Sequence, residues 1–222
     1  MDSNKKLRLL VGVPTMGDMN AMLVSHLIKW AKEFDKTEIS FYFTFKVAPV
    51  ERARNDVARF FMKERKQKDG TPIDTFTHLF FVDSDTVPPA DAIKKLLAHD
   101  KEMVSGVTPI LHYDKQRKAW GTLDNCFKSY TRDAENKIIK THAVERDTGL
   151  QQIEKCGGSC LLIKREVFEK MQKPYFKFLY NEDGTEPTKS EDLYFCERAI
   201  EAGFKIYCDT SVICNHYKDV VL

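Results

Sequence analysis

The feature that most constrains the fold is an alternation, in the first half of the chain, of short apolar segments with longer segments of helical periodicity. The apolar segments are typical of strands, and the segments between them place apolar side chains at helical spacing. We interpret Pro14 as the end of the first strand. In chain order, the expected elements are strand 9–13, helix 20–34, strand 39–45, helix 50–66 and strand 77–82. Strands that alternate with helices predict a parallel sheet with crossover connections.

The alternation stops in the middle of the chain. Residues 113–154 are polar and irregular, and we expect short strands at 120–123 and 137–140 around turn residues at 134–136. This stretch predicts an insertion that carries a hairpin and lies over the mouth of the sheet.

Regular elements flank this insertion on both sides. Pro88 and Pro89 favour the first turn of a helix. The expected elements are helix 90–98, strand 103–107, strand 159–163, helix 165–172, helix 191–202, and strands 205–208 and 211–214. Because no repeat, linker or low-complexity segment divides the chain, we expect one α/β domain over 1–222, with a mainly parallel central sheet flanked by helices.

Composition restricts the class of protein. Of the 222 residues 42% are apolar and 31% are charged, as in a soluble globular protein, and no run approaches the ~18 apolar residues of a membrane span. The net charge of +2 is far below the concentrated positive charge of typical nucleic-acid-binding domains, although it leaves room for a basic face. We interpret the basic run at 63–68 as a solvated helix end, where cations suit the helix dipole.

The N-terminus and the cysteines favour a reducing compartment. Residues 1–6 are polar and basic, and the apolar run at 7–11 is too short and too charged for a signal peptide. We therefore expect a cytoplasmic protein. Its six cysteines are expected to be free thiols.

Polar residues directly after strands are the candidates for a site, because loops and helix N-termini converge at the carboxyl edge of a parallel sheet. The clearest case is Asp83, Ser84 and Asp85, which follow the strand at 77–82. Two carboxylates separated by one residue can hold Mg²⁺ or Mn²⁺, which keeps positions open for diphosphate oxygens. The alternative is an ordinary acidic turn in which Asp85 caps the next helix.

Three segments in order resemble the motifs of one enzyme family. Residues 77–85 look like its strand and metal-binding DXD motif, and residues 157–168 look like its glycine-led acceptor-side strand and following helix. Residues 190–199, followed by 203–206, look like its Glu-Asp motif and the strand after it. The chain thus resembles the nucleotide-sugar-dependent glycosyltransferases of the Rossmann-like GT-A fold. The likeness is greatest to the large inverting family two, which also contains cellulose and chitin synthases.

The resemblance implies a metal-dependent transfer of a sugar from a UDP- or GDP-sugar to an acceptor hydroxyl, with inversion. Residues 1–107 would form the half that binds the donor and the metal ion, and residues 108–222 the half that binds the acceptor. Mn²⁺ or Mg²⁺ would be held by Asp83, Asp85 and His216, with Asp85 the more direct ligand and Asp83 a ribose or metal contact. The implied donor side comprises Pro14, Thr15, Met16, Gly17, Arg54, Asn55, Asp83, Ser84 and Asp85.

The acceptor side is also implied by the resemblance. Asp192 matches the catalytic base, which removes the proton of the acceptor hydroxyl. The implied acceptor-binding residues are Trp120, Gly157, Gly158 and Glu191. The alternative for Glu191 and Asp192 is that they cap the first turn of a helix after Ser190.

Other interpretations of the C-terminal residues stay open. His216 can be an exposed histidine near the chain end, and Lys218 either steadies a leaving diphosphate or is a surface lysine. Cys208, Cys214 and His216 can contribute to a zinc site, although their spacing fits no common four-ligand pattern.

The sequence also departs from the family and admits rival functions. Residues 43–46 lack the acidic residues that commonly recognise the base, and the Gln-x-x-Arg-Trp motif of processive synthases is missing. One rival is a nucleotidyltransferase, although only Met16, Gly17 and Asp18 stand where its glycine-rich phosphate loop is expected. The other is a noncatalytic sugar-nucleotide-binding module, which needs no Asp192. A glycan, a protein or a modified nucleobase remains open as acceptor, as does the oligomeric state.

Overall fold

The computed structural model describes residues 6–36, 38–66, 72–73, 75–114, 118–133 and 138–218. At its centre is a seven-stranded sheet. In sheet order, the strands are β12 (Leu150–Ile153), β16 (Ile206–Ile213), β7 (Met103–Val107), β13 (Cys160–Lys164), β5 (His78–Val82), β1 (Leu9–Thr15) and β2 (Ile39–Phe45). Strands β2, β1, β5, β7 and β16 run in one direction, and β13 and β12 run against them. The expected α/β fold with a mainly parallel sheet is confirmed.

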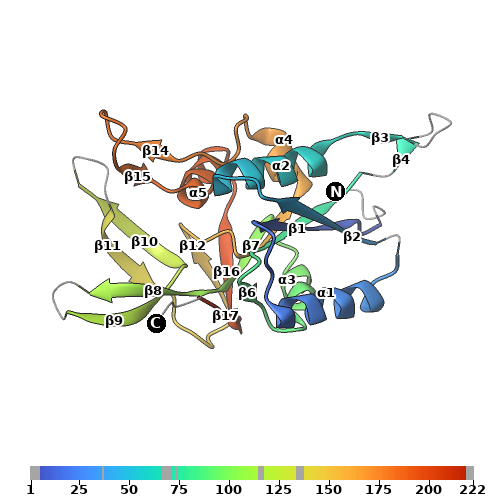
Figure 1. Cartoon of the computed structure of the whole chain (residues 1–222), viewed down its shortest axis with the longest axis horizontal. Coiled ribbons are helices and arrows are strands. Elements are labelled where there is room, and N and C mark those ends of the chain that lie inside the picture. Colours follow the sequence, from blue (N-terminus) through green and yellow to red (C-terminus); the bar gives the residue numbers. More distant parts are fainter. Residues whose placement is uncertain are drawn as a thin grey trace.

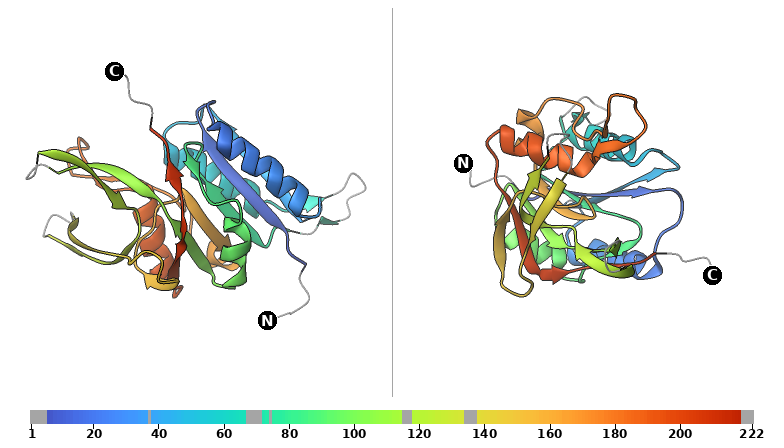
Figure 2. Two further views of the ribbon diagram at one scale, coloured as in Figure 1. Left: turned by 90° about the horizontal axis from the view of Figure 1, so that it is seen from below. Right: turned by 90° about the vertical axis from the view of Figure 1, so that its left-hand side faces the viewer.

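Helices cover both faces of this sheet (Figures 1 and 2). One face carries α2 (Val50–Met62), α4 (Arg165–Lys170) and α5 (Glu191–Glu201), and the other carries α1 (Ala21–Glu33) and α3 (Ala92–Ala98). Each face has its own apolar core. The helices contribute to it with side chains that recur every three or four residues and so lie on one side of the helix. On α1, for example, this stripe consists of Leu23, Leu27 and Trp30.

The insertion after β7 contains two hairpins where we expected one. β8 (Pro109–Asp114) pairs with β9 (Ala119–Asp124), and β10 (Phe127–Arg132) pairs with β11 (Ile138–Ala143). The predicted strand 120–123 lies in β9 and the predicted strand 137–140 overlaps β11, so the expectation that they pair was wrong. The predicted turn at 134–136 lies outside the described residues. Figure 1 shows both hairpins at the end of the molecule away from α1.

Three shorter pairs complete the described strands. They are β3 (Arg65–Lys66) with β4 (Pro72–Ile73), β6 (Thr86–Val87) with β17 (Asn215–His216), and β14 (Leu179–Tyr180) with β15 (Pro187–Lys189). The pair of β6 and β17 ties the C-terminal segment to the residues directly after Asp85.

Several element boundaries differ from expectation. β1 continues through Pro14, which is paired with β2 alone because the pairing with β5 ends at Gly12. α2 ends at Met62 and Lys63 is extended (φ −65°, ψ 131°), so the assignment of 63–66 to a helix end was wrong, and residues 67–68 lie outside the described part. The helix expected at 90–98 begins at Ala92.

The last two predicted strands form one strand, β16. Asp209, which we took to lie between them, accepts hydrogen bonds from the backbone N–H and the hydroxyl of Ser211 (2.9 and 2.7 Å) and pairs with His99 (2.8 Å). These partners hold the polar residue inside a buried strand, where local sequence favours a turn.

Two further expectations concern the whole chain. No helix in the described part is long and apolar enough to cross a membrane. All six cysteines are buried and none is in a disulfide, in agreement with the expected free thiols.

Candidate active site

A cleft of about 480 Å³ opens at the carboxyl ends of β1 and β5. It brings together the loop after β1 and the turn after β5, which the sequence separates by almost seventy residues. The lining residues are Pro14, Thr15, Met16, Asp18, Met19, Asn20, Val47, Ala48, Val50, Ala53, Asp83, Ser84, Asp85 and Tyr217. Most of the predicted donor-side residues therefore share one cavity.

The loop after β1 is organised by the hydroxyl of Thr15. This hydroxyl donates to the carbonyl of Asp18 (2.7 Å) and accepts from the backbone N–H of Gly17 (3.0 Å). Gly17 has φ +131°, a conformation that favours glycine. The backbone N–H of Asn20 then donates to the carbonyl of Ser84 (2.9 Å) and joins this loop to the acidic turn.

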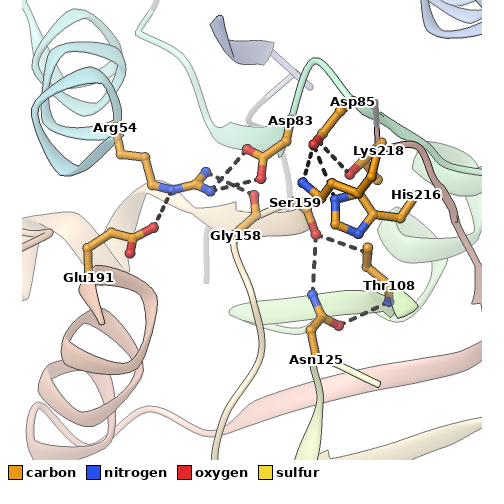
Figure 3. A network of polar contacts seen from close by, with 11 residues as sticks. Arg54, Asp83, Asp85, Thr108, Asn125, Gly158, Ser159, Glu191, His216 and Lys218 are labelled. Carbon is orange, nitrogen blue, oxygen red and sulfur yellow. Dashed lines mark hydrogen bonds and ion pairs between the residues drawn. The ribbon is translucent and has the colours of Figure 1, made fainter. Parts of the chain in front are cut away.

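Arg54 is the buried centre of the site (Figure 3). From α2 its guanidinium donates to Asp83 Oδ2 (3.0 Å), to Glu191 Oε1 (3.1 Å) and to the carbonyl of Gly158 (3.1 Å). Arg54 therefore connects the turn after β5, the residues directly before β13 and the first turn of α5. Burial opposes the charge of Arg54, but the carboxylates of Asp83 and Glu191 outweigh it and raise the pKa of the guanidinium.

Glu191 is the more deeply buried of the two carboxylates. Its side chain is 8% exposed, whereas that of Asp83 is 27% exposed. Burial and the charge of neighbouring Asp192 raise the pKa of Glu191, while Arg54 acts in the opposite direction. Asp83 Oδ1 is buried and receives no hydrogen bond, although it lies 3.0 Å from Arg54 Nη2.

Asp85, on the same turn as Asp83, faces the C-terminal segment. Its Oδ2 lies 3.2 Å from His216 Nε2 and 2.6 Å from Lys218 Nζ. Burial alone raises the pKa of Asp85, but the hydrogen bonds from His216 and Lys218 outweigh it and hold that pKa well below its usual range. The hydrogen bond between His216 and Asp85 also raises the pKa of His216.

The orientation of His216 suits a metal ligand. Its Nδ1 lies 2.8 Å from the carbonyl of Pro109, which can only accept, so Nδ1 carries a proton. In the neutral ring Nε2 would then be the nitrogen left free for a metal ion held between His216 and Asp85, and a second partner fixes the tautomer of a metal-binding histidine in the same way. Carboxylate and imidazole are ligands that Mn²⁺ accepts, so Asp85 and His216 fit such an ion.

Asp83 is not grouped with this pair, because it is turned to Arg54. Within the described ranges, no three His, Cys, Asp or Glu side chains are arranged so that they could hold a metal ion. The cysteines of the alternative zinc site, Cys208 and Cys214, are both buried. The zinc alternative therefore has no geometric support.

The two glycines before β13 make room for side chains of the protein itself. A Cβ on Gly158 would lie 2.6 Å from Arg54 Cζ, and one on Gly157 would lie 2.4 Å from Asn125 Nδ2. Asn125 belongs to a buried polar network with Thr108 and Ser159 (Figure 3). Arg54 and Asn125 thus fill the space beside both glycines. The acceptor contact that the resemblance implies for Gly157 and Gly158 therefore has no support from this geometry.

Asp192 follows Glu191 in the first turn of α5 and is partly exposed. Its Oδ1 accepts hydrogen bonds from the hydroxyl of Ser190 and from the backbone N–H of Leu193 (2.7 Å). Among the described residues Oδ2 has no hydrogen-bond partner. One carboxylate oxygen is therefore fixed and the other is free to accept a proton.

Not every predicted residue lines the cleft, and Asn55 and Trp120 are two that do not. Asn55 accepts from the backbone N–H groups of Tyr175 and Phe176 (3.0 and 3.2 Å) and donates to the carbonyl of Phe176 (2.7 Å), so it holds a loop on another side of α2. Trp120 is 67% exposed on β9 and is not among the described lining residues of the cleft.

Sequence reasoning missed several residues of the site. Val47 and Ala48 follow β2 as the first loop follows β1, so their place after a parallel strand was a usable signal. Tyr217 and the network of Thr108, Asn125 and Ser159 had no such signal, because distant contacts define them.

Comparison with solved structures shows how far the fold is shared. A197 from STIV is 21% identical with a TM-score of 0.55, and the match covers 96% of this chain and 87% of A197. Two more distant matches are GalNAc-T7 with UDP, GalNAc and Mn²⁺ (10% identity, TM-score 0.49, 97% of this chain and 44% of that one) and the inositol-1-phosphate CTP transferase from T. maritima (13%, 0.43, 96% and 90%). The match to A197 bears on the fold alone, and the other two support no conclusion. A search of the curated proteins finds no match.

Comparison with protein families gives a direct result. The family described as glycosyltransferase like family 2 matches residues 43–220, which contain the acidic turn, the glycine pair and the first turn of α5. This match spans most of the chain, and the chain therefore belongs to the glycosyltransferase-like family 2 and is a glycosyltransferase.

Proposed function

We propose that the enzyme transfers a sugar from a UDP- or GDP-sugar to an acceptor hydroxyl, with a divalent metal ion and with inversion at the anomeric carbon. The observation that carries the proposal is the position of Arg54. It links the acidic turn that lines the cleft to the first turn of α5, which bears Asp192.

The donor occupies the cleft in this proposal. Residues 14–17 and Ser84 surround the nucleotide and its diphosphate, and Asp85 and His216 hold Mn²⁺ or Mg²⁺. The bound ion supplies charge neutralisation for the diphosphate that leaves. Lys218 contacts Asp85 through its ammonium group, which is free to turn to a diphosphate when an ion takes its place.

Asp83 has a different part in this scheme. It is held by Arg54 and lines the cleft with a side chain that is 27% exposed, so its carboxylate is placed to contact a ribose hydroxyl. Asp83 then contacts the donor without serving as a main metal ligand.

Asp192 is the proposed base. The hydrogen bonds from Ser190 and Leu193 fix one oxygen, and the other oxygen accepts the proton as the acceptor hydroxyl attacks. Glu191 cannot share this task, because it is buried against Arg54. Residues 1–107 form the donor half, and the hairpins of 108–222, with Trp120 exposed on β9, form the platform for the acceptor.

The test is an assay of nucleoside diphosphate release from a panel of UDP- and GDP-sugars, with water or added hydroxyl compounds as acceptors. We expect release that requires Mn²⁺ or Mg²⁺ and stops with EDTA. Asp85→Asn should weaken donor binding and turnover together, whereas Asp192→Asn should keep donor binding and lower turnover by about 10²-fold. Asp91→Asn, at an exposed aspartate paired with Lys95, is the matched control and should have full activity.

Four results would contradict the proposal. Full activity in EDTA would exclude a role for the metal ion, and release of pyrophosphate would indicate nucleotidyl transfer. Donor binding without turnover for any acceptor indicates a binding module. Proton NMR of the first-formed product decides the stereochemistry: a β-linked product from an α-linked donor supports inversion, and an α-linked product removes Asp192 as the base.

A further inference from the structure

The strand β2 forms one edge of the central sheet. It is paired with β1 through its whole length, and among the described residues no strand pairs with its other side. Edge strands are usually protected by lysine, proline, a bulge or short length. The seven residues of β2, Ile-Ser-Phe-Tyr-Phe-Thr-Phe, contain no charge and no proline, and their pairing with β1 has no bulge.

An apolar groove runs beside this edge. It has a volume of about 450 Å³ and is formed by α1, the residue before its cap, and one face of β2. Its lining residues are Met19, Val24, Leu27, Ile28, Ala31, Phe41, Phe43 and Phe45. Single exposed apolar residues are ordinary on a protein surface, but a continuous groove beside an open strand edge marks an interaction site.

The helix α1 contributes a second apolar stripe to this groove. Leu23, Leu27 and Trp30 already face the core of the protein. Val24, Ile28 and Ala31 repeat the same helical spacing one residue later, and Val24 and Ile28 are 40% and 53% exposed. The packing of the single chain therefore leaves this second stripe uncovered.

The sequence of β2 is symmetric in residue type about Tyr42. If β2 pairs in antiparallel fashion with a second β2 and Tyr42 lies on the two-fold axis, Phe41 of one chain faces Phe43 of the other, Ser40 faces Thr44 and Ile39 faces Phe45. Glu38, in the turn directly before the strand, and Lys46, directly after the strand with φ 53°, then approach each other at both ends of the pair. Aromatic pairs, small polar pairs and opposite charges are the cross-strand partners that stabilise a sheet.

We propose that this edge is the interface of a symmetric homodimer, in which two β2 strands join the two sheets and the two α1 helices cover the groove. A two-fold interface uses the same patch on both subunits, so the patch must be complementary to itself. The match of Glu38 to Lys46 and of Phe41 to Phe43 meets that condition, which another kind of partner does not require. Odd-numbered residues of β2 face odd-numbered residues, so both α1 helices lie on one face of the joined sheet.

The test is the mass of the protein in solution, measured by light scattering across about 1 to 100 µM protein, with the charge pair as the probe. The wild type should reach twice the chain mass of 25.7 kDa. Glu38→Lys alone and Lys46→Glu alone should shift the equilibrium to the monomer, because each places like charges opposite each other at both ends. The double variant Glu38→Lys/Lys46→Glu should restore the dimer.

A second pair of variants tests the groove. Phe45→Lys, at a side chain that is 63% exposed, should give a folded monomer, whereas Ile139→Lys, at a side chain that is 65% exposed on β11, should leave the dimer intact. Circular dichroism checks that each variant is folded. Amide hydrogen exchange should show protection of β2 that increases with protein concentration in the wild type and not in Phe45→Lys.

Two outcomes would overturn the proposal. One is a wild-type monomer at every concentration, which would leave the groove to another partner. The other is a dimer that survives the single charge variants and Phe45→Lys, which would place the interface elsewhere.

Discussion

The two carboxylates of the turn after β5 have opposite surroundings, although one residue separates them. Asp83 is turned to Arg54, which also binds Glu191, and the side chains of Arg54 and Glu191 are 4% and 8% exposed. Asp85 points to the rim and joins His216 and Lys218, the latter 52% exposed. The inner cluster consists of Arg54, Asp83 and Glu191, and the outer cluster consists of Asp85, His216 and Lys218.

The two clusters differ in how they respond to the loss of one charged partner. In the inner cluster the charges are buried and depend on one another, so the loss of one leaves the others unpaired away from water. In the outer cluster water or a bound ion can replace a missing partner at little cost. We therefore expect changes in the inner cluster to affect the free energy of unfolding, and changes in the outer cluster to affect ligand binding.

The largest effect should follow Arg54→Met. The substitution removes the only described cation that both Asp83 and Glu191 contact, and we expect the free energy of unfolding to fall by about 3–5 kcal/mol. Urea denaturation measures it. Arg59→Met is the control on the same helix: its side chain is 70% exposed and pairs with Asp56, so its effect should stay within about 1 kcal/mol. Equal effects of the two variants would remove the distinction between buried and exposed cations.

Gly158→Ala should be the next most damaging change. Its Cβ would lie 2.6 Å from Arg54 Cζ, so the guanidinium has to move from its three acceptors, and we expect a loss of about 2 kcal/mol. Gly121→Ala on β9 is the control, since a Cβ there meets no heavy atom within 4 Å. If thermal unfolding shows the same stability for both variants, close approach is not the reason for glycine at 158.

Asp83→Asn and Asp85→Asn compare the two clusters directly. Asp83→Asn weakens a charge-assisted hydrogen bond to buried Arg54, and we expect a loss of about 1–2 kcal/mol in stability. Asp85→Asn should cost less than about 1 kcal/mol, because its partners are partly exposed. In calorimetric titration with Mn²⁺, Asp85→Asn should lose the larger share of affinity. The reverse order in either measurement contradicts the division.

The smallest effect should appear in the pH dependence of the outer cluster without metal. The hydrogen bond to Asp85 raises the pKa of His216 above 6.5, so its stabilisation is fully present below pH 6.5 and is lost as the pH rises through the folded pKa. Wild type should therefore exceed His216→Gln in stability by up to about 1 kcal/mol near pH 5.5, and the gap should close near pH 8.5. If the difference in stability between wild type and His216→Gln increased with pH, it would contradict the raised pKa of His216.

The sequence could predict much of the fold because local pattern and tertiary structure agree there. The segment 39–45 was predicted with the bounds that β2 has, since its aromatic and β-branched residues stand between polar residues. The end of α2 could not be predicted in this way, because Lys63 and Glu64 are good helix formers, whereas Arg65 and Lys66 pair with a later segment of the chain. The break predicted between two strands at Asp209 was wrong for the same reason, since its partner His99 lies 110 residues away in the sequence.

The site divides in a similar way. The acidic turn could be placed beside the first loop because both follow strands of a parallel sheet. Arg54 and Asn55 were assigned together to the donor side, yet adjacent residues on a helix point about 100° apart, so both could not face one cleft. The roles of Gly157 and Gly158 depend on side chains from other elements, which no local pattern announces.

The reversed direction of β13 has a consequence for how this enzyme can change. β7 and β13 are antiparallel neighbours, so residues 108–159 amount to one long connection that leaves the catalytic edge and returns to it. The cost of closing a connection rises slowly with its length. The hairpins within it can therefore be lengthened, shortened or exchanged while the registers of β5, β7 and β13 stay as they are. New surfaces can thus be presented at this end of the molecule while the acidic turn after β5 and its contact with Arg54 keep their positions.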